Sequence, residues 1–496
     1  MSIFLPLLFL FIGVTISIYS FITGGIFFHT DIARDFLLFD DIVTNHHLAL
    51  IGPHSGGISG VFHGPAWLYL NIPAFILGQG NPWVVGTFWL VLVLLSIYLL
   101  WRIAYRLFGS TTALWTAALY SLYAITYTRN LLNPFGAVLL FALFFYFIYH
   151  YLKTSKSIHL GISLFVLGMI VQFQIAFGAP ILILTVCIVL RHIIHTKKYI
   201  HMFYFFVLLI PLSTYIVFEL RHDFLQIRSI LTYIRTAHGD NNLPWYTFPL
   251  DRAKNILESV QLFPYWWANT IMIVVGYVLL RNKKITRKRN VFRLFLYYFI
   301  GYWLITLFYK GTIWQYYYWP FLPVIILLVV ELLRYVSKFQ KIVLYSVLGV
   351  GTLFIQIRLL SGANMQTDAS SWIFQEKVAH TVFEDAPKEF GYYVFTPDLF
   401  GYSPRYTLMY ENRKYTNKHA FAFTKKRTTY LVIAPPPNDR LFLNGIWWKN
   451  NQVNIHKKPT KVFTYKNGFR VEKYILSPKE QAQSSDPNLI QSLIFR

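Results

Sequence analysis

The sequence predicts a mainly α-helical protein that crosses a membrane many times and carries a small α/β domain near its C-terminal end. Three observations support this fold class. Hydrophobic residues make up 55% of the 496 residues and charged residues only 13%, which is more apolar sequence than a water-soluble core of this length needs. Apolar runs of about 18 residues recur from Ile3 to Leu360. After Gly362 these runs stop, and proline and charged residues become more frequent.

The apolar runs predict membrane-spanning helices, because about 20 helical residues cross the hydrocarbon layer. The first run has no basic N-terminal region and no small-residue cleavage site, so we expect it to remain in the protein as a span. We predict about eleven spans, at residues 3–28, 83–101, 113–128, 137–152, 159–177, 180–194, 200–218, 265–280, 291–308, 318–336 and 342–360.

The run "GPAWLYLNIPAFILG" at residues 64–78 is shorter than a span and is interrupted by Pro73. We therefore expect it to form an interfacial helix in the first outer loop, at a depth that suits Trp67 and Tyr69.

The basic residues indicate the orientation of the chain. The formal net charge of +24 could indicate nucleic-acid binding, but lysine and arginine lie between the apolar runs, which is typical of membrane topology. Basic clusters such as "RHIIHTKK" and "RNKKITRKRNVFR" fall on one face, which we assign to the cytoplasm. The N-terminus is then cytoplasmic and the C-terminal domain lies outside. We expect a multi-pass protein of the plasma membrane, of bacterial origin.

Acidic residues are scarce and clustered. Residues 1–361 contain ten, of which nine face outside in this topology and four lie in the first outer loop: Asp31, Asp35, Asp40 and Asp41. On a helix, Asp31 and Asp35 share one face with Arg34 beside them. Such a cluster is where we expect chemistry. The alternative is structural: Asp31 caps a surface helix and Asp35 pairs with Arg34 or solvent.

Three stretches carry a resemblance to a known superfamily. "HTDIARDFL" has an acidic residue just after the first span, "VFHGPAWLYL" follows about thirty residues later, and "RLFGSTTALWTAALYSLYAITYTRNLLNPFG" contains a cytoplasmic turn, a span and an outer loop. Together they resemble the C superfamily of membrane glycosyltransferases, especially the protein O-mannosyltransferase family and the lipid A aminoarabinose transferases. Two positions depart from that pattern. Ile32 replaces the second acid, and Gly64 replaces a lysine before proline, which leaves His63 to take its place.

The resemblance implies an inverting transfer of a sugar from a polyprenyl phosphate to an acceptor hydroxyl on the outer face. The acceptor must lose a proton, which implies Asp31 as general base with Asp35 as the alternate. The phosphate leaving group needs cations, and those available outside are Arg34, His63, Arg129, Arg221 and His222. Asp40, His54 and Gln315 are the candidates for contacts to substrate. The expected partners are the lipid-linked donor, a glycan, lipid or protein acceptor, and membrane lipids; we expect no metal or cofactor.

Several of these residues have structural alternatives. Arg129 follows a span and could extend to the membrane surface. "FELRHDF" at residues 218–224 could form a local ion-pair cluster, and Gln315 lies among aromatic residues typical of a membrane interface.

Two other functions remain open. A transporter or flippase of a lipid-linked saccharide would also be polytopic, but transporters place ionisable groups near mid-membrane and often contain repeats, and neither is visible here. An oligosaccharyltransferase usually carries an Asp-x-Asp pair, which Asp31-Ile32-Ala33 lacks.

We divide the chain into a membrane domain (1–361), an outer α/β domain (362–477) and a loose tail (478–496). "SSWIFQEKVAHTVFED" predicts a helix that starts at serine, "YYVFTP" and "TTYLVIAPPP" predict buried strands, and "KVFTYKNGFRVEKYIL" predicts a hairpin around Asn467-Gly468. The single cysteine, Cys187, excludes an intrachain disulfide.

Overall fold

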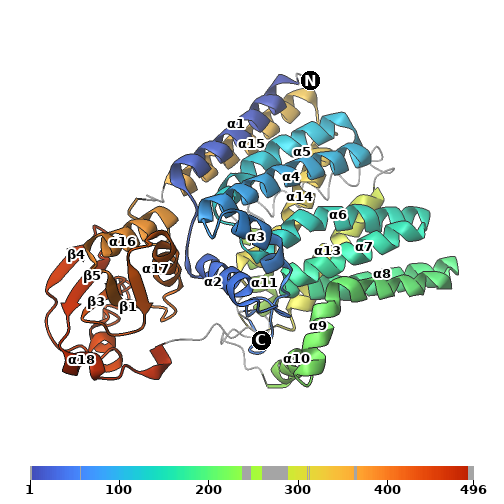
Figure 1. The fold of residues 1–496 in the computed structure, drawn as a ribbon. Helices are drawn as coiled ribbons and strands as arrows, with labels where there is room; N and C mark the ends of the chain where they lie inside the picture. The colour runs from blue at the N-terminus through green and yellow to red at the C-terminus, as the bar shows by residue number, and fades with distance from the viewer. Residues whose placement is uncertain are drawn as a thin grey trace.

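The membrane domain is a bundle of long apolar helices (Figure 1). The computed structural model describes residues 3–55, 57–236, 247–259, 289–309, 311, 313–361 and 366–489. Within these ranges, six helices are long and apolar enough to cross a membrane: α1 (Phe4–Gly24), α4 (Pro82–Phe108), α6 (Asn133–Thr154), α8 (Ile175–Thr196), the continuous helix Tyr199–Arg221 and α15 (Lys338–Ser361). The protein is therefore a multi-pass membrane protein.

Shorter helices complete the bundle: α5 (Ser110–Tyr123), α7 (Ser157–Phe173), α13 (Arg289–Thr306) and α14 (Leu322–Leu333). The predicted spans coincide with these helices and the six longer ones, except for 265–280, which lies outside the described residues. The span predicted at 200–218 combines a 3₁₀ segment, Tyr199–Leu208, with α9 (Leu209–Arg221).

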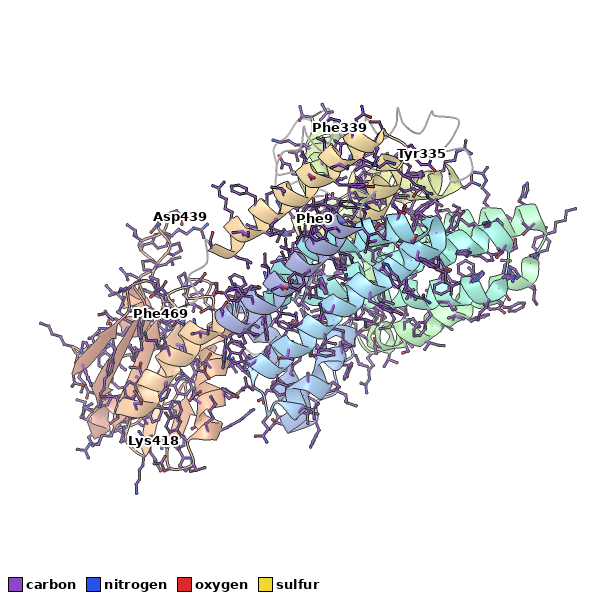
Figure 2. All side chains as sticks on the ribbon, turned by 90° about the horizontal axis from the view of Figure 1, so that it is seen from above. Phe9, Tyr335, Phe339, Lys418, Asp439 and Phe469 are labelled. Carbon is purple, nitrogen blue, oxygen red and sulfur yellow. The ribbon has the colours of Figure 1, made fainter. Side chains whose placement is uncertain are left out.

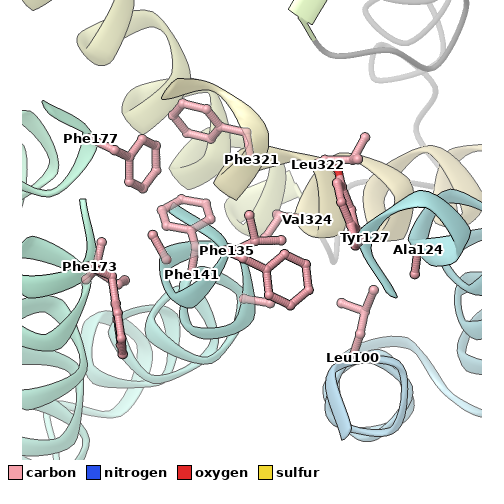
Figure 3. Close-up of a cluster of buried hydrophobic side chains, with 14 of the residues drawn as sticks. Leu100, Ala124, Tyr127, Phe135, Phe141, Phe173, Phe177, Phe321, Leu322 and Val324 are labelled. Atoms are coloured by element: carbon pink, nitrogen blue, oxygen red, sulfur yellow. The ribbon is translucent and has the colours of Figure 1, made fainter. Parts of the chain in front are cut away.

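Aromatic side chains form much of the bundle core. Phe141 of α6, Phe177 of α8 and Phe321, which directly precedes α14, meet edge to face with ring centroids 5.0–5.2 Å apart. Figure 3 shows the three rings converging from different helices. Because edge-to-face contacts of this kind are directional, they fix the relative rotation of the helices as well as burying apolar surface.

The loop between α1 and α4 contains α2 (Thr30–Asn45) and α3 (Ala66–Leu77). The helix at 66–77 was expected, but it continues through Pro73. Trp67 does not mark a lipid interface, because it is fully buried and stacks on Trp89 of α4 with centroids 6.3 Å apart. Nε1 of Trp89 in turn donates to Oδ1 of Asn71 at 2.6 Å. The α3 helix is thus held by the protein core.

The outer domain is built on a five-stranded sheet in the order β2-β1-β3-β5-β4. The strands are β1 (Glu389–Phe395), β2 (His419–Ala422), β3 (Thr428–Ile433), β4 (Lys461–Thr464) and β5 (Arg470–Ile475). β1 is parallel to β2 and β3, whereas β5 is antiparallel to β3 and β4. Helices α16 (Trp372–Asp385) and α17 (Tyr402–Lys414) pack on one face. The predicted α/β architecture is confirmed, including the Ser371 cap of α16, whose side chain accepts from the backbone N–H of Phe374.

The segment after the last strand differs from the expected loose tail. Residues 477–489 contain α18 (Pro478–Ala482) and pack against the outer domain. The Tyr393 hydroxyl and Ser485 Oγ lie 2.8 Å apart, and Nδ2 of Asn454 donates to the Ser484 carbonyl at 2.7 Å. The segment alone did not reveal these contacts, because its partners, Tyr393 and Asn454, lie in other parts of the chain.

The outer domain is fixed directly onto the outer ends of two membrane helices (Figure 1). Just after α1, the Phe28 carbonyl accepts from Ser403 Oγ at 2.7 Å. Just before α4, the Gly80 carbonyl accepts from the Tyr406 hydroxyl at 2.6 Å. Trp372 is fully buried against Phe28, with centroids 4.9 Å apart. Side chains and backbone therefore join the two domains through a packed interface.

We expect Trp372→Ala to lower the free energy of unfolding by about 3–5 kcal/mol, because the indole is completely buried and a large cavity would replace it. Chemical unfolding of the purified protein in detergent measures this change. Val462→Ala is the control, since the Val462 side chain is exposed on β4 and its truncation should change stability by less than about 0.5 kcal/mol. A loss below about 1 kcal/mol for Trp372→Ala would contradict a cohesive interface.

Candidate active site

The start of α2 is positioned by contacts at its N-terminus. Nδ1 of His29 accepts from the backbone N–H of Asp31 at 3.3 Å and so caps the helix. Nε2 of the same ring lies 3.1 Å from Oδ1 of Asn130 in the next outer loop. A carboxylate in the first turn is also favoured by the helix dipole. Asp31 therefore lies at a fixed place just outside the membrane helices.

Arg34 joins the two candidate carboxylates. Its Nη1 lies 2.7 Å from Oδ1 of Asp31, and its Nη2 lies 2.9 Å from Oδ1 of Asp35. The environments of the acids differ, because the Asp31 side chain is 55% exposed and that of Asp35 only 4%. One guanidinium thus holds an acid that solvent and substrate can reach and an acid that they cannot.

Burial raises the pKa of Asp35 to about 6, although the adjacent Arg34 opposes the shift. Because the ordinary value is 3.8, the folded protein binds this proton more tightly than the unfolded chain. The stabilisation from this group is therefore complete below about pH 4 and is lost as the pH rises through about 6. Its burial makes Asp35 poorly suited to accept a proton from a substrate.

We expect the melting temperature of the wild type to depend on pH between about 4 and 6 in a way that Asp35→Asn removes. The stabilisation contributed by Asp35 falls as the pH rises. The melting temperature of the wild type should therefore decrease relative to that of the variant between about pH 4 and 6. Melting curves of the two purified proteins at several pH values measure the difference. Parallel curves would show that Asp35 does not titrate there.

The loop at residues 50–65 holds two histidines in different ways. Nε2 of His54 accepts from the backbone N–H of Gly60 at 3.3 Å, and the side chain is exposed. His63 is buried, and its Nδ1 accepts from the backbone N–H of Ile175 at 3.4 Å. Burial lowers the pKa of His63 to about 3, so the ring is neutral near pH 7 and cannot supply the phosphate-binding cation for which it was a candidate.

Asp40 and Arg129 have structural partners. Asp40, a candidate for substrate contact, forms an ion pair with Arg413 of α17 across the domain interface. Arg129 is 4% exposed, and its Nε donates to the Gly25 carbonyl at 3.2 Å, at the end of α1. Its guanidinium lies 5.2 Å from the Phe27 ring centroid. No described contact joins either side chain to the Asp31 carboxylate.

In the described contacts the charged side chains of residues 218–224 do not pair with one another; Oδ2 of Asp223 instead lies 4.0 Å from Nη2 of Arg228. Glu219 accepts from the backbone N–H groups of Gln226 and Ile227 and so holds the start of α10 (Leu225–Thr236). His222 stacks on Phe218 and donates from Nδ1 to its carbonyl at 2.9 Å. Arg221 is exposed at the end of α9. These contacts do not bring Arg221 and His222 together with Asp31.

Arg252 is a buried cation that sequence reasoning missed. It lies on α11 (Phe248–Ser259), is 1% exposed, and donates from Nη2 to the carbonyls of Tyr309 and Gly311 at 2.8 and 2.5 Å. Among the described residues no carboxylate pairs with it, and its Nε has no hydrogen-bond partner. A buried guanidinium with only neutral partners suits an anionic ligand.

A cavity of about 450 Å³ lies beside α11 and the 3₁₀ turn Gln315–Tyr317. It contains Gln315, one of the candidate substrate contacts. Its lining residues are Asn255, Glu258, Ile313, Trp314, Gln315, Tyr316 and Trp319. Burial raises the pKa of Tyr316, and among the smaller contributions the charge of Asp31 raises it whereas that of Arg34 lowers it. The cavity is large enough for a sugar-sized group.

A metal centre has no evident ligand set in the part of the chain that the structure describes. No group of three or more histidine, cysteine, aspartate or glutamate side chains gathers there.

No protein-family profile and no curated protein matches the sequence. Solved structures do match the fold. ArnT from Cupriavidus metallidurans bound to undecaprenyl phosphate has a TM-score of 0.58 and 10% identity, covering 94% of this chain and 97% of its own. Its apo state gives the same values. The apo oligosaccharyltransferase of Archaeoglobus fulgidus has a TM-score of 0.50 and 11% identity, covering 84% of this chain and 64% of its own.

The chain therefore has the fold of ArnT and, more distantly, that of the archaeal oligosaccharyltransferase. The likeness to ArnT extends over nearly the whole length of both proteins and includes the outer domain. The fold implied by the sequence resemblance is confirmed.

Proposed function

We propose that the protein is an inverting glycosyltransferase that moves a sugar from a polyprenyl-phosphate donor to an acceptor hydroxyl on the outer face of the membrane. The observation that carries this proposal is the exposed Asp31, held by Arg34 at the start of the first outer helix, in a chain with the fold of ArnT. ArnT is described as bound to undecaprenyl phosphate.

The proposed reaction is a single displacement. The acceptor oxygen forms a bond to the anomeric carbon as the bond from that carbon to the phosphate oxygen breaks. The acceptor proton passes to a carboxylate oxygen of Asp31, and the electron pair leaves with the phosphate. Attack opposite the leaving group inverts the anomeric centre.

The cations have separate roles in this scheme. Arg34 orients Asp31 through the 2.7 Å ion pair. Arg252 provides a buried positive charge for the donor phosphate. In the described contacts its Nη2 donates only to the neutral carbonyls of Tyr309 and Gly311, which the phosphate would replace as a partner. The cavity around Gln315 is the proposed place for the donor sugar. His54 stays a candidate for acceptor contact.

Three other predicted site residues have supporting roles in the proposal: Asp35, Arg221 and His222. Asp35 is the alternate base, and its buried carboxylate mainly holds Arg34 in place. Arg221 and His222, at the end of α9, are candidates for contact with the lipid phosphate while the donor approaches. The proposed orientation keeps the N-terminus cytoplasmic and the outer domain outside, in a bacterial plasma membrane.

The test is transfer of radiolabelled sugar from a panel of polyprenyl-phosphate sugars into membrane acceptors by the purified protein in liposomes. Transfer that needs both donor and acceptor supports the proposal. Movement of a fluorescent lipid-linked saccharide across the bilayer, with no transfer from any donor, would indicate a flippase instead.

A further inference from the structure

One edge of the outer-domain sheet exposes a concentrated apolar surface. β1 and β3 are parallel neighbours, so their carboxyl ends lie at the same edge. The loops that follow them expose six large hydrophobic side chains, which we call the apolar edge: Leu399, Phe400, Leu441, Phe442, Ile446 and Trp447. Between residues 366 and 489 the comparably exposed large hydrophobic side chains elsewhere are Val462 and Ile475. The exposed apolar residues of the domain are thus gathered in one place.

The loops that carry the apolar edge are held by specific contacts. Gly445 has a φ of +78°, and a Cβ there would lie 3.0 Å from Ile433 and 3.2 Å from Phe395, so the chain passes directly over the ends of β3 and β1. Nη2 of Arg470 donates to the Asn444 carbonyl at 2.9 Å. The backbone N–H of Phe400 donates to Oδ1 of Asp398 at 3.1 Å. The outward direction of the apolar side chains is therefore part of the fold.

The apolar edge lies close to the membrane helices. Oδ2 of Asp398 accepts from Thr30 Oγ1 at 2.6 Å, and Thr30 follows the end of α1 by only six residues. The helix after this loop, α17, contacts the chain just outside α1 and α4. Figure 2 shows Asp439, from the second loop, on the flank of the outer domain on the same side as α15. Both loops therefore occupy the part of the domain nearest the bilayer.

We propose that the apolar edge inserts into the headgroup region of the outer leaflet and that the lipid surface is its partner. Its largest member, Trp447, is of a type enriched at membrane interfaces. Arg440 and Lys449 flank it, which suits anionic headgroups. An exposed apolar patch of this concentration is unusual on a surface that faces only water. This proposal does not depend on the transferase reaction.

The test measures the surroundings of single side chains in the full-length protein. In a Cys187→Ser background, Phe442→Cys, Trp447→Cys and, as the control, Val462→Cys are each labelled with a nitroxide. Val462 is exposed on β4, outside the apolar edge. The proteins are placed in nanodiscs of phosphatidylethanolamine and phosphatidylglycerol, and electron paramagnetic resonance measures collisions with oxygen and with a water-soluble nickel chelate.

We expect the ratio of oxygen to nickel accessibility to be severalfold higher at positions 442 and 447 than at position 462, because oxygen concentrates in lipid and the chelate does not. Equal ratios at all three positions would overturn the proposal, since the edge would then face water. Protection of 442 and 447 from both reagents would also overturn it, because a second copy or another protein would cover the edge. Phe400→Cys provides an independent position in the first loop if a variant of the second loop does not fold.

Discussion

Asp31→Asn should lower the turnover of sugar transfer by about 10²- to 10⁴-fold, because the amide cannot accept the acceptor proton. The donor affinity should change little, since Arg34 and Arg252 remain. The substitution keeps the shape of the side chain, and Asp31 is exposed, so folding should be preserved. Transfer rates at saturating donor and acceptor, together with equilibrium binding of the donor, measure the two effects separately.

Asp41→Asn is the matched control for this prediction, because Asp41 lies on the same helix and pairs with His47 instead of Arg34. It should retain nearly the full rate. If Asp31→Asn also retained it, Asp31 would not be the base, and Asp35 would be the next residue to test. A rate loss shared by both variants would point to a general effect on α2.

Arg252→Gln should weaken binding of a polyprenyl phosphate by about 10- to 100-fold, which corresponds to the loss of about 1.5–3 kcal/mol for hydrogen bonds to a charged group. The variant should melt close to the wild type without the lipid, because glutamine can still donate to a carbonyl and the buried charge has no carboxylate partner in the described contacts. The stabilisation that the lipid gives to the wild type should be largely absent. Binding of radiolabelled undecaprenyl phosphate to the purified protein measures the affinity.

Two further variants sharpen the result for Arg252. Arg252→Lys should recover part of the affinity, since it restores the charge without the planar fork. Arg228→Gln is the control, because Arg228 is an exposed arginine on α10. Unchanged lipid affinity in Arg252→Gln, with transfer intact, would exclude Arg252 from the phosphate site.

Local signals in the sequence were sufficient for much of the fold. Apolar length identified the membrane helices, and Asn467-Gly468 identified the hairpin, where Gly468 has a φ of +83°. The α17 helix was missed, because "YSPRYTLMYENRK" has little apolar periodicity and its tyrosines are buried only through contacts with residues such as Phe28 and Trp372.

The candidate site was predicted less completely, because several of its properties also depend on contacts between residues far apart in the sequence. The Asp31, Arg34 and Asp35 cluster is local in the sequence and could be recognised there. The charge state of His63 and the isolation of Arg252 arise from burial by distant segments, which a single sequence does not reveal. The ion pair of Asp40 with Arg413 could not be anticipated either, because the two residues lie 373 positions apart.

Under the proposed function, the packed interface between the domains would also limit which acceptors can react. The α17 helix is bonded directly to the chain at the ends of α1 and α4 and to Asp40 of α2, so the α/β domain and the helix that carries Asp31 are held together by direct contacts. We infer that an acceptor hydroxyl must be presented at one fixed height above the lipid. A molecule with a reactive hydroxyl that cannot reach this height would then not react, whatever its chemical structure.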